Sequence, residues 1–481
     1  MNSKQRWDAV VVGAGPNGLS AAVELAHHGG RVLLLEAADR VGGAARTEEL
    51  TLPGFHHDVG SAVYPLGVGS PFFARLPLEE HGLEWIHGSA PLAHPLDGGR
   101  AVVLERDVRT TALGLGGDAR RYGALLDPLV RRWPDFARQI LGAPLTLPRD
   151  PVLMARFGLS ALWPAGALAR RRFHTPEARA LFAGNAAHAA LPLDRTPTSA
   201  IALVLMAAGH AVGWPVPRGG AGALTGALAS YARSLGVAIE TGRRVAHLSE
   251  LPPAKSVLLD LTPRQVLEVA GDALPDGYRR RLEEWRYGPG AFKVDWALDG
   301  PIPWAADACR RAVTIHLGGT LREMEEAEAL PWKGESAERP FVLLAQPTLF
   351  DPTRAPEGKH TAWAYCHVPN GWRGGEELML RRLEDQVERF APGFRDRILA
   401  RSVLGPADLE AWNPNLVGGD IGGGAVTLGQ TLARPRAFPD PWSTPVPGLY
   451  ICSSSTPPGP GVHGMCGYHA ARRAIRGKAL S

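Results

Sequence analysis

An apolar run that ends in a glycine-rich turn, near the start of the chain, most constrains the fold. Residues 9–12 lead into Gly13-Ala14-Gly15-Pro16-Asn17-Gly18, and residues 19–26 follow with apolar side chains at helical spacing. This order predicts the strand, tight turn and helix of a dinucleotide-binding fold. We expect Gly13 to permit the turn, Gly15 to let backbone approach a pyrophosphate, and Gly18 to allow close packing of the helix. The phosphates would rest on backbone amides at the positive helix end.

A second buried strand is expected at residues 31–35, and it ends in Glu36. A carboxylate there accepts hydrogen bonds from a ribose hydroxyl and repels a 2′-phosphate, which favours FAD or NAD over NADP. The segment Arg40-Val41-Gly42-Gly43-Ala44-Ala45-Arg46-Thr47 follows. It resembles the part of glutathione-reductase-like flavoproteins that lies beneath the FAD pyrophosphate and ribityl chain. The alternative is an ordinary loop with two solvated arginines. Residues 7–47 therefore predict a site for the ADP half of FAD.

The whole chain has an ordinary globular composition. Its 481 residues allow two or three domains, and 45% hydrophobic residues allow large cores. The net charge is only +4 and the basic residues are scattered, so we infer no nucleic-acid partner. A polar N-terminus without a visible secretory signal, and apolar runs well short of about 20 residues, predict a soluble protein.

The four cysteines suggest neither a disulfide framework nor a metal site. Their spacing fits no zinc motif, so we expect no metal and reduced thiols in the cytoplasm. Two histidines beside Asp58 raise a metal alternative, but no third ligand is spaced nearby and a turn with polar tips is the simpler interpretation. We expect Gly60 and Ser61, just after this turn, to approach the flavin.

The middle of the chain indicates a separate substrate domain. Residues 125–140, 151–171 and 198–212 carry apolar side chains at helical spacing and no second dinucleotide signature. Residues 152–163 place large apolar side chains before three arginines at 170–172. One interpretation is a membrane-surface helix that delivers a lipophilic substrate. The other is a core helix that ends in solvated arginines.

The chain then returns to the predicted cofactor domain and leaves it again. A glycine-rich turn at 217–224 precedes an expected helix at 225–235, strands at 237–240 and 244–248, and a buried strand at 256–261. Residues 292–298 alternate between apolar and polar, which puts Lys293 and Asp295 on one face of a strand. That face is either a solvated sheet surface or the wall of a substrate cavity. Residues 341–344 and 361–367 are expected to be further strands.

The C-terminal segment combines a strand with a glycine-rich helix start. The strand at 448–452 ends in small hydroxyl residues, and glycines then recur before the helix at 468–475. Amide dipoles there would face the negative edge of a reduced flavin. Cys466, at this position, has either a lowered pKa or a plain packing role. With no partner cysteine, packing is the simpler interpretation.

These segments together resemble the phytoene-desaturase-like family of FAD-dependent oxidoreductases, in its pyridine nucleotide-disulphide oxidoreductase domain-containing protein 2 branch. The resemblance rests on VVGAGPNGL, GGAART, HDVGSAVYP, RGGAGAL, YGPGAFKVDWAL, NPNLVGGDIGGG and LYICSSSTPPGPGVHGMCGYHAAR. It implies an adenine contact at the backbone of Val245. The usual Gly-Asp after the last strand is Ser453-Ser454 here, so Ser454 is expected to replace the aspartate at the ribityl chain. No cysteine pair exists to reduce disulfides through the flavin.

The predicted fold is α/β: a glutathione-reductase-like FAD-binding Rossmann domain (residues 1–64, 214–261 and 425–481) with a discontinuous mixed-sheet and helical substrate domain (65–213 and 262–424). The implied function is oxidation of a largely apolar small molecule by hydride transfer to flavin N5. The alternatives are a flavin amine oxidase, a double-bond isomerase and a non-catalytic flavin-binding scaffold. Lys293 is the one side-chain candidate for catalysis. The expected cofactor-binding residues are Gly13, Gly15, Pro16, Asn17, Gly18, Glu36, Ala37, Arg40, Gly42, Gly43, Arg46, Thr47, Gly60, Ser61, Val245, Ser454, Val462, His463, Gly464 and Met465.

Overall fold

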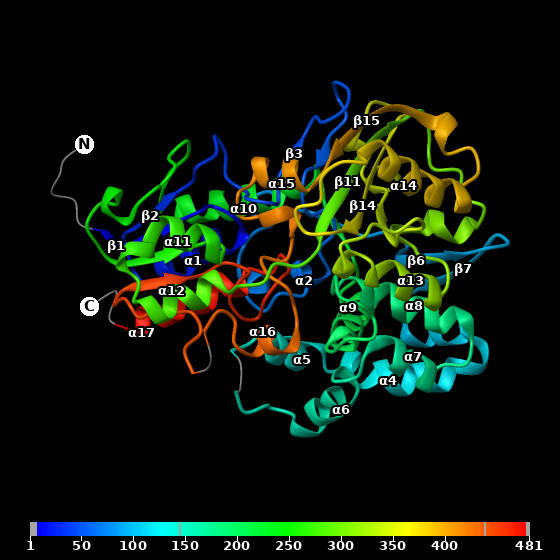
Figure 1. Cartoon of the computed structure of the whole chain (residues 1–481), viewed down its shortest axis with the longest axis horizontal. Helices are drawn as coiled ribbons and strands as arrows, with labels where there is room; N and C mark the ends of the chain where they lie inside the picture. The colour runs from blue at the N-terminus through cyan, green and yellow to red at the C-terminus, as the bar shows by residue number, and fades with distance from the viewer. Residues whose placement is uncertain (1–6, 144–145, 437–438, 478–481) are drawn as a thin grey trace.

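The computed structural model describes residues 7–143, 146–436 and 439–477, and two large sheets organise them. One sheet is built around β1 (Trp7–Val12) and β2 (Val32–Leu35), and the other around β11 (Gly290–Leu298) and β14 (His360–Val368). In Figure 1 the elements of the first sheet lie at the left and those of the second at the right.

The first sheet has five parallel strands in the order β16-β10-β1-β2-β9. The other three strands are β9 (Ala238–Glu240), β10 (Ala254–Leu259) and β16 (Leu449–Ile451). Val11 pairs with Leu258 on one side and Leu34 on the other. Such continuous apolar strands are typical of a parallel sheet that is covered on both faces. The predicted strands at 9–12, 31–35 and 256–261 are confirmed.

Helices cover both faces of this sheet. One core contains side chains of α1 (Pro16–His27), α10 (Ala221–Ser234) and α17 (Met465–Arg476). The opposite core contains side chains of α11 (Pro263–Ala270) and α12 (Asp276–Glu283). The division of the chain into two domains stays a prediction. The packing puts α11 and α12 on the five-stranded sheet, beyond the predicted boundary at residue 262.

The second sheet has seven strands in the order β15-β11-β14-β13-β12-β6-β7, and every pairing is antiparallel except that of β12 with β6. Its other strands are β6 (Ala90–Leu96), β7 (Arg100–Leu104), β12 (Ala312–Leu317), β13 (Val342–Ala345) and β15 (Ile398–Leu404). Strands β13 and β14 confirm the predictions at 341–344 and 361–367. Phe292, Val294 and Trp296 face one core with α14 (Glu376–Phe390).

A layer of helices covers the other face of this sheet, as the lower right of Figure 1 shows. These helices are α4 (Ala119–Arg131), α5 (Trp133–Ile140), α6 (Pro151–Ala161), α7 (Ala165–Arg172), α8 (Pro176–Ala187), α9 (Thr198–Ala211) and α13 (Leu321–Ala329). The remaining short elements are β3 (Thr47–Glu48), β4 (His57–Asp58), α2 (Pro65–Val68), β5 (Trp85–Ile86), α3 (Val108–Gly114), β8 (Val216–Pro217), α15 (Pro406–Trp412) and α16 (Leu428–Leu432).

Several predicted elements differ from the structure. The region 65–212, expected to be helical, also contributes β6 and β7 to the second sheet. Strand β6 was not predicted because it contains Pro91 and Pro95, and proline in a sequence argues against a strand inside a sheet. The pairing of β6 with β12 spans only Ala90 to Ala93. The expected helices at 125–140 and 151–171 are each two helices, and residues 244–248 form no strand.

Helices α6 and α7 meet at a bend of 104°. Within the three described ranges, no single helix has both the length and the apolar composition of a membrane span, and only this bent pair meets the two criteria jointly.

Candidate functional site

A cavity of about 640 Å³ connects the glycine-rich turn with the second sheet. Its wall includes Gly13, Gly15 and Glu36 from the first sheet and Lys293 and Trp363 from the second. The carboxyl ends of parallel strands β1, β2 and β10 therefore open into the same space as the polar face of β11. Ligands of open parallel sheets bind at this edge.

Two glycines let the turn after β1 adopt its shape. Gly13 has φ of 99°, in the left-handed region that favours glycine. A side chain at Gly18 would collide with the carbonyl oxygen of Gly13, so α1 packs directly on the turn. Gly15, Pro16 and Asn17 line the cavity at the start of α1, while Gly18 lies behind them. Pro16 has no N–H and the Gly18 amide donates to Asp260, so the amides of Gly15 and Asn17 are the donors left at this helix start for an anionic phosphate.

Glu36 stands at the end of β2 and lines the cavity beside Ala37. Its carboxylate accepts hydrogen bonds from the amides of Ala14, at 2.7 Å, and Ala38, at 2.9 Å. These bonds fix the carboxylate at the cavity wall, where remaining lone pairs can accept a ribose hydroxyl. Val245 lines the same part of the cavity from an irregular segment after β9.

Asp260 is a cavity residue that the sequence did not reveal. It follows β10, is partly exposed at the cavity wall, and accepts a 2.8 Å hydrogen bond from the amide of Gly18. Burial raises the pKa of Asp260 to about 7, the Gly18 amide opposes this shift, and Glu36 adds to it. A carboxyl group whose pKa is raised in this way carries less negative charge near neutral pH and repels a neighbouring pyrophosphate less. The only sequence signal was an acidic residue at the end of a buried parallel strand.

The second glycine pair approaches the first turn. A side chain on Gly43 would meet the Cα atom of Gly15 at 2.9 Å, and the amide of Gly42 donates to the carbonyl of Ala14 at 2.9 Å. Arg46 lines the cavity, and its guanidinium stacks 4.6 Å from the centre of the Trp412 ring. The buried Nε of Arg46 has no hydrogen-bond partner among the described residues. The Nη2 atom of Arg46 pairs with Glu48 at 3.3 Å, so Arg46 brings a partly compensated positive charge to the wall.

The remaining predicted cofactor residues separate into two groups. Gly60, Ser61, Val462 and Ser454 line the cavity. Arg40, Gly42, Thr47, His463, Gly464 and Met465 lie outside its wall. Thr47 instead donates to Asp58 at 2.8 Å and accepts from the amide of Gly222 at the start of α10 at 3.0 Å.

The three consecutive serines after β16 have different roles. The hydroxyls of Ser453 and Ser455 donate to the carbonyls of Leu261 and Gly423, at 2.7 and 2.6 Å. Ser454 is partly exposed to the cavity, and its hydroxyl makes no side-chain hydrogen bond among the described residues. The role of Ser454 as the replacement for the missing aspartate stays a prediction.

Cys466 is a packing residue. It is fully buried in α17, and burial raises the pKa of the Cys466 thiol to about 12. Its sulfur donates to the carbonyls of Thr456 and Gly459, at 3.3 and 3.4 Å. The alternative of an activated thiolate at the helix start is therefore wrong, because a helix end does not compensate for complete desolvation.

Lys293 lies on the cavity face of β11 and is only 3% exposed. It forms an ion pair with Asp295, two residues along the same face, and its ammonium lies 5.9 Å from the centre of the Trp363 ring. Burial lowers the pKa of Lys293, whereas Asp295 and Asp58 oppose that shift. The solvated-surface interpretation of Lys293 and Asp295 is therefore wrong, since helices from a distant segment cover this face of the sheet.

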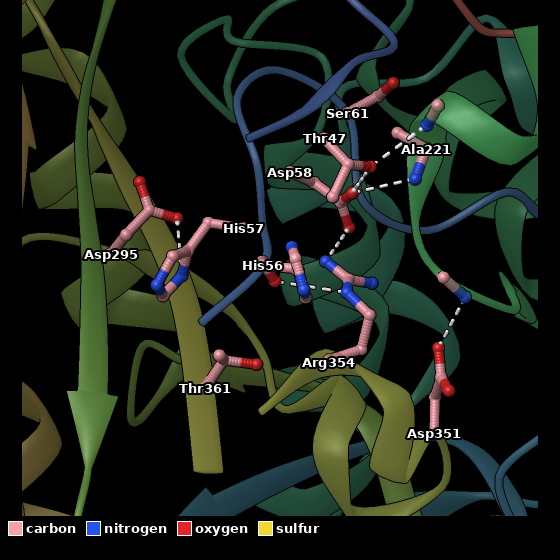
Figure 2. A network of polar contacts seen from close by, with 12 residues as sticks. Thr47, His56, His57, Asp58, Ser61, Ala221, Asp295, Asp351, Arg354 and Thr361 are labelled. Atoms are coloured by element: carbon pink, nitrogen blue, oxygen red, sulfur yellow. Dashed lines mark hydrogen bonds and ion pairs between the residues drawn. The ribbon is translucent and has the colours of Figure 1, made fainter. Parts of the chain in front are cut away.

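His57 and Asp58 are also buried, so the predicted turn with polar tips is wrong. Figure 2 shows His57 beside Asp295 and Asp58 beside Arg354. The distances are 3.6 Å from His57 Nδ1 to Asp295 Oδ1 and 3.0 Å from Arg354 Nη2 to Asp58 Oδ2. Burial, followed by the charge of Lys293, lowers the pKa of His57 to about 3, so the ring is neutral. This network joins the segment after the second glycine pair to the seven-stranded sheet.

The wall of the cavity thus fits FAD. A helix start faces the place for phosphates, a fixed carboxylate faces the place for a ribose, and the guanidinium of Arg46 lies at the wall.

The chain is similar to several known proteins. A family model described as an NAD(P)-binding Rossmann-like domain matches residues 11–76. Pyridine nucleotide-disulfide oxidoreductase domain-containing protein 2 of Rattus norvegicus is 29% identical, over 98% of this chain and 94% of the rat protein. Phytoene dehydrogenase of Streptomyces griseus is 28% identical, over 81% of this chain and 77% of its own length.

The chain is a homologue of the phytoene and carotenoid desaturases. It is an FAD-dependent oxidoreductase. A solved structure of a putrescine oxidase variant has the same fold, with a TM-score of 0.62, 17% identity, and coverage of 98% of this chain and 99% of that one. The oxidoreductase therefore shares its overall fold with this putrescine oxidase.

Proposed function

We propose that this oxidoreductase dehydrogenates a largely apolar small molecule, in the manner of a desaturase. One observation carries the proposal: a single cavity joins the predicted FAD site to a wall of apolar side chains. That wall contains Ile201, Val204 and Leu205 from α9, Leu343 from β13 and Trp363 from β14. The relatives named as phytoene dehydrogenase and carotenoid 3,4-desaturase support this substrate class.

When bound, FAD would supply the redox chemistry, as the acceptor of a hydride from a substrate C–H bond. The contribution of the chain is to orient the substrate and exclude water. Trp363 and Tyr365 are 7% and 8% exposed and present their rings from the same face of β14. Such rigid aromatic surfaces hold a flat unsaturated molecule by stacking rather than by hydrogen bonds.

Anaerobic absorbance of the FAD-loaded protein tests the proposal. We expect an unsaturated apolar extract to bleach the flavin and an amine panel to leave it unchanged. Bleaching by amines alone would favour the amine oxidase alternative. A rearranged double bond without bleaching would favour the isomerase, and no response to any compound would favour the scaffold.

We also propose that Lys293 places a positive charge at the reacting part of the cavity. Lys293→Met keeps the apolar stem and removes the charge, so we expect flavin reduction or its reoxidation by oxygen to slow at least roughly tenfold, about 1.4 kcal/mol. Stopped-flow absorbance measures both rates. Rates within about twofold of wild type would contradict this role.

A matched control separates charge from stability. Lys359→Met removes a partly exposed lysine that pairs with Asp299, and it should leave both rates unchanged. Because Lys293→Met leaves Asp295 buried without its cation, Lys293→Met/Asp295→Leu removes both charges and should show the same slow rates.

We further propose that the surface of α6 contacts a membrane and admits the apolar substrate. Val152, Leu159 and Leu162 are 66%, 75% and 60% exposed around this helix, although apolar side chains of this size are usually buried. The guanidinium of Arg171 lies 5.5 Å from the centre of the partly exposed Trp163 ring. Basic and aromatic side chains beside an apolar surface favour anionic lipid. No co-sedimentation with anionic vesicles would contradict this.

We also propose that the protein is located in the cytoplasm. All four cysteines are free and buried, and the structure pairs none of them in a disulfide. Reduced cysteines support a reducing compartment.

A further inference from the structure

The cavity wall between α8 and β14 carries polar groups that the proposed chemistry does not use. His188 follows α8 and His367 lies on β14, and both line the cavity. Glu328 of α13 and His316 of β12 lie behind them and are each at most 2% exposed. We name His188, His316, His367 and Glu328 the histidine wall. Its surroundings are apolar and include Trp214, Leu343 and Tyr365.

The His367 ring donates from one nitrogen and presents the other to the cavity. Its Nδ1 lies 2.8 Å from Oε2 of Glu328, and the two residues are 5% and 2% exposed. Burial lowers the pKa of His367, but the carboxylate of Glu328 outweighs it and the pKa is raised. A buried carboxylate at 2.8 Å favours the doubly protonated ring, in which Nε2 is a second N–H donor. Within the described ranges, Nε2 has no hydrogen-bond partner.

His188 supplies a second ring nitrogen beside the first. Its Nε2 lies 2.9 Å from Nε2 of His316, so one ring donates and the other accepts. Burial, followed by the charge of His367, lowers the pKa of His188 to about 3, and the ring is neutral. The His188 Nδ1 bonds to none of the described residues, and His188 is partly exposed although it lies in the interior. That exposure is to the cavity.

The charges at this wall are balanced within the chain. The positive charge of His367 is paired with Glu328, and that of Lys293, one strand away, is paired with Asp295. A carboxylate ligand would enter this dry space without a counter-charge of its own, which is costly. An uncharged oxygen needs no counter-charge and satisfies the free donor of His367.

We infer that the histidine wall binds the uncharged oxygen of a carbonyl or hydroxyl group on the apolar substrate. This inference rests on the proposed function, because it assigns a polar group to the molecule that fills the same cavity. The substrate class is then a largely apolar ketone, aldehyde or alcohol rather than a pure hydrocarbon or a fatty acid.

Binding of four matched probes to the FAD-loaded protein tests the inference. The probes are decane, 2-decanone, 1-decanol and decanoate, and the readout is the fluorescence of tryptophans such as Trp214 and Trp363 at the cavity. A hydrogen bond from a charged donor predicts that the ketone and the alcohol bind at least about tenfold more tightly than decane. Decanoate should bind more weakly than either. Tightest binding of decanoate would overturn the inference.

Variants test whether the preference for oxygenated probes depends on the histidine wall. His367→Phe/Glu328→Leu removes both partners of the buried pair, so it leaves no unpaired charge. It should reduce the preference for ketone over decane to within about twofold and leave the decane affinity unchanged. The control His360→Phe changes a histidine at the start of the same strand, outside the cavity wall, and should keep the preference. Loss of the preference in His360→Phe but not in the double variant would overturn the inference.

The outcomes also separate this inference from the function on which it rests. Equal binding of decane and the oxygenated probes to wild type would reject the polar site and leave the apolar substrate standing. If none of the four probes binds, the proposed apolar cavity fails and the inference fails with it.

Discussion

Arg354→Met is expected to lower the free energy of unfolding by about 3–5 kcal/mol, because it leaves the buried carboxylate of Asp58 without its cation. Arg354 and Asp58 are each 1% exposed at their side chains, and their ion pair measures 3.0 Å. Arg354 Nε also donates to the carbonyl of His56 at 3.1 Å. Figure 2 shows that Arg354 approaches Asp58 and His56 from a different element, so its loss separates two parts of the fold.

Denaturant unfolding at saturating FAD measures this change in the free energy of unfolding. The control is an ion pair whose arginine side chain is exposed to solvent. Arg131→Met removes an ion pair with Asp127 whose arginine side chain is 76% exposed, and it should cost less than about 1 kcal/mol. A second variant, Arg354→Met/Asp58→Asn, removes both charges and should recover part of the loss. An Arg354→Met protein as stable as Arg131→Met would show that the pair contributes nothing.

Glu36→Ala is expected to raise the dissociation constant of FAD by about one to two orders of magnitude. A hydrogen bond to a charged acceptor contributes roughly 1.5–3 kcal/mol. The carboxylate of Glu36 also fixes the amides of Ala14 and Ala38, so the variant loosens the turn that faces the phosphates. Both effects weaken binding of the cofactor and leave the parallel sheet in place.

Titration of the apoprotein with FAD, followed by flavin fluorescence, measures the change. Glu36→Gln keeps one oxygen acceptor and should fall between Glu36→Ala and wild type. Glu240→Ala removes a carboxylate that ends the neighbouring strand β9 and itself lies outside the cavity wall, where it pairs at 2.9 Å with the cavity residue Arg243. It should bind FAD as wild type does. Equal affinity in Glu36→Ala and Glu240→Ala would reject the ribose assignment.

The sequence by itself identified those elements whose structure and role are set by residues close to one another in the chain. The dinucleotide-binding motif, made of the glycines after β1 and the acidic end of β2, could be recognised from the sequence. Its turn, helix start and carboxylate lie within about 25 residues of one another. Alternation in β11 showed that Lys293 and Asp295 share a face, since successive side chains of a strand point to opposite sides. Alternation left open what that face meets.

The tertiary structure alone decided what meets that face. His57 and Asp58 looked like a polar turn, but Arg354, 298 residues beyond His56, and Asp295 enclose them. Asp260 lies beside Gly18 although the two residues are 242 positions apart in the sequence. Strand β6 belongs to the second sheet although it contains two prolines. Local periodicity reports only which side of a segment is apolar. Whether a charge on the other side is solvated or buried depends on which distant segment packs over it, and that is set by the fold as a whole.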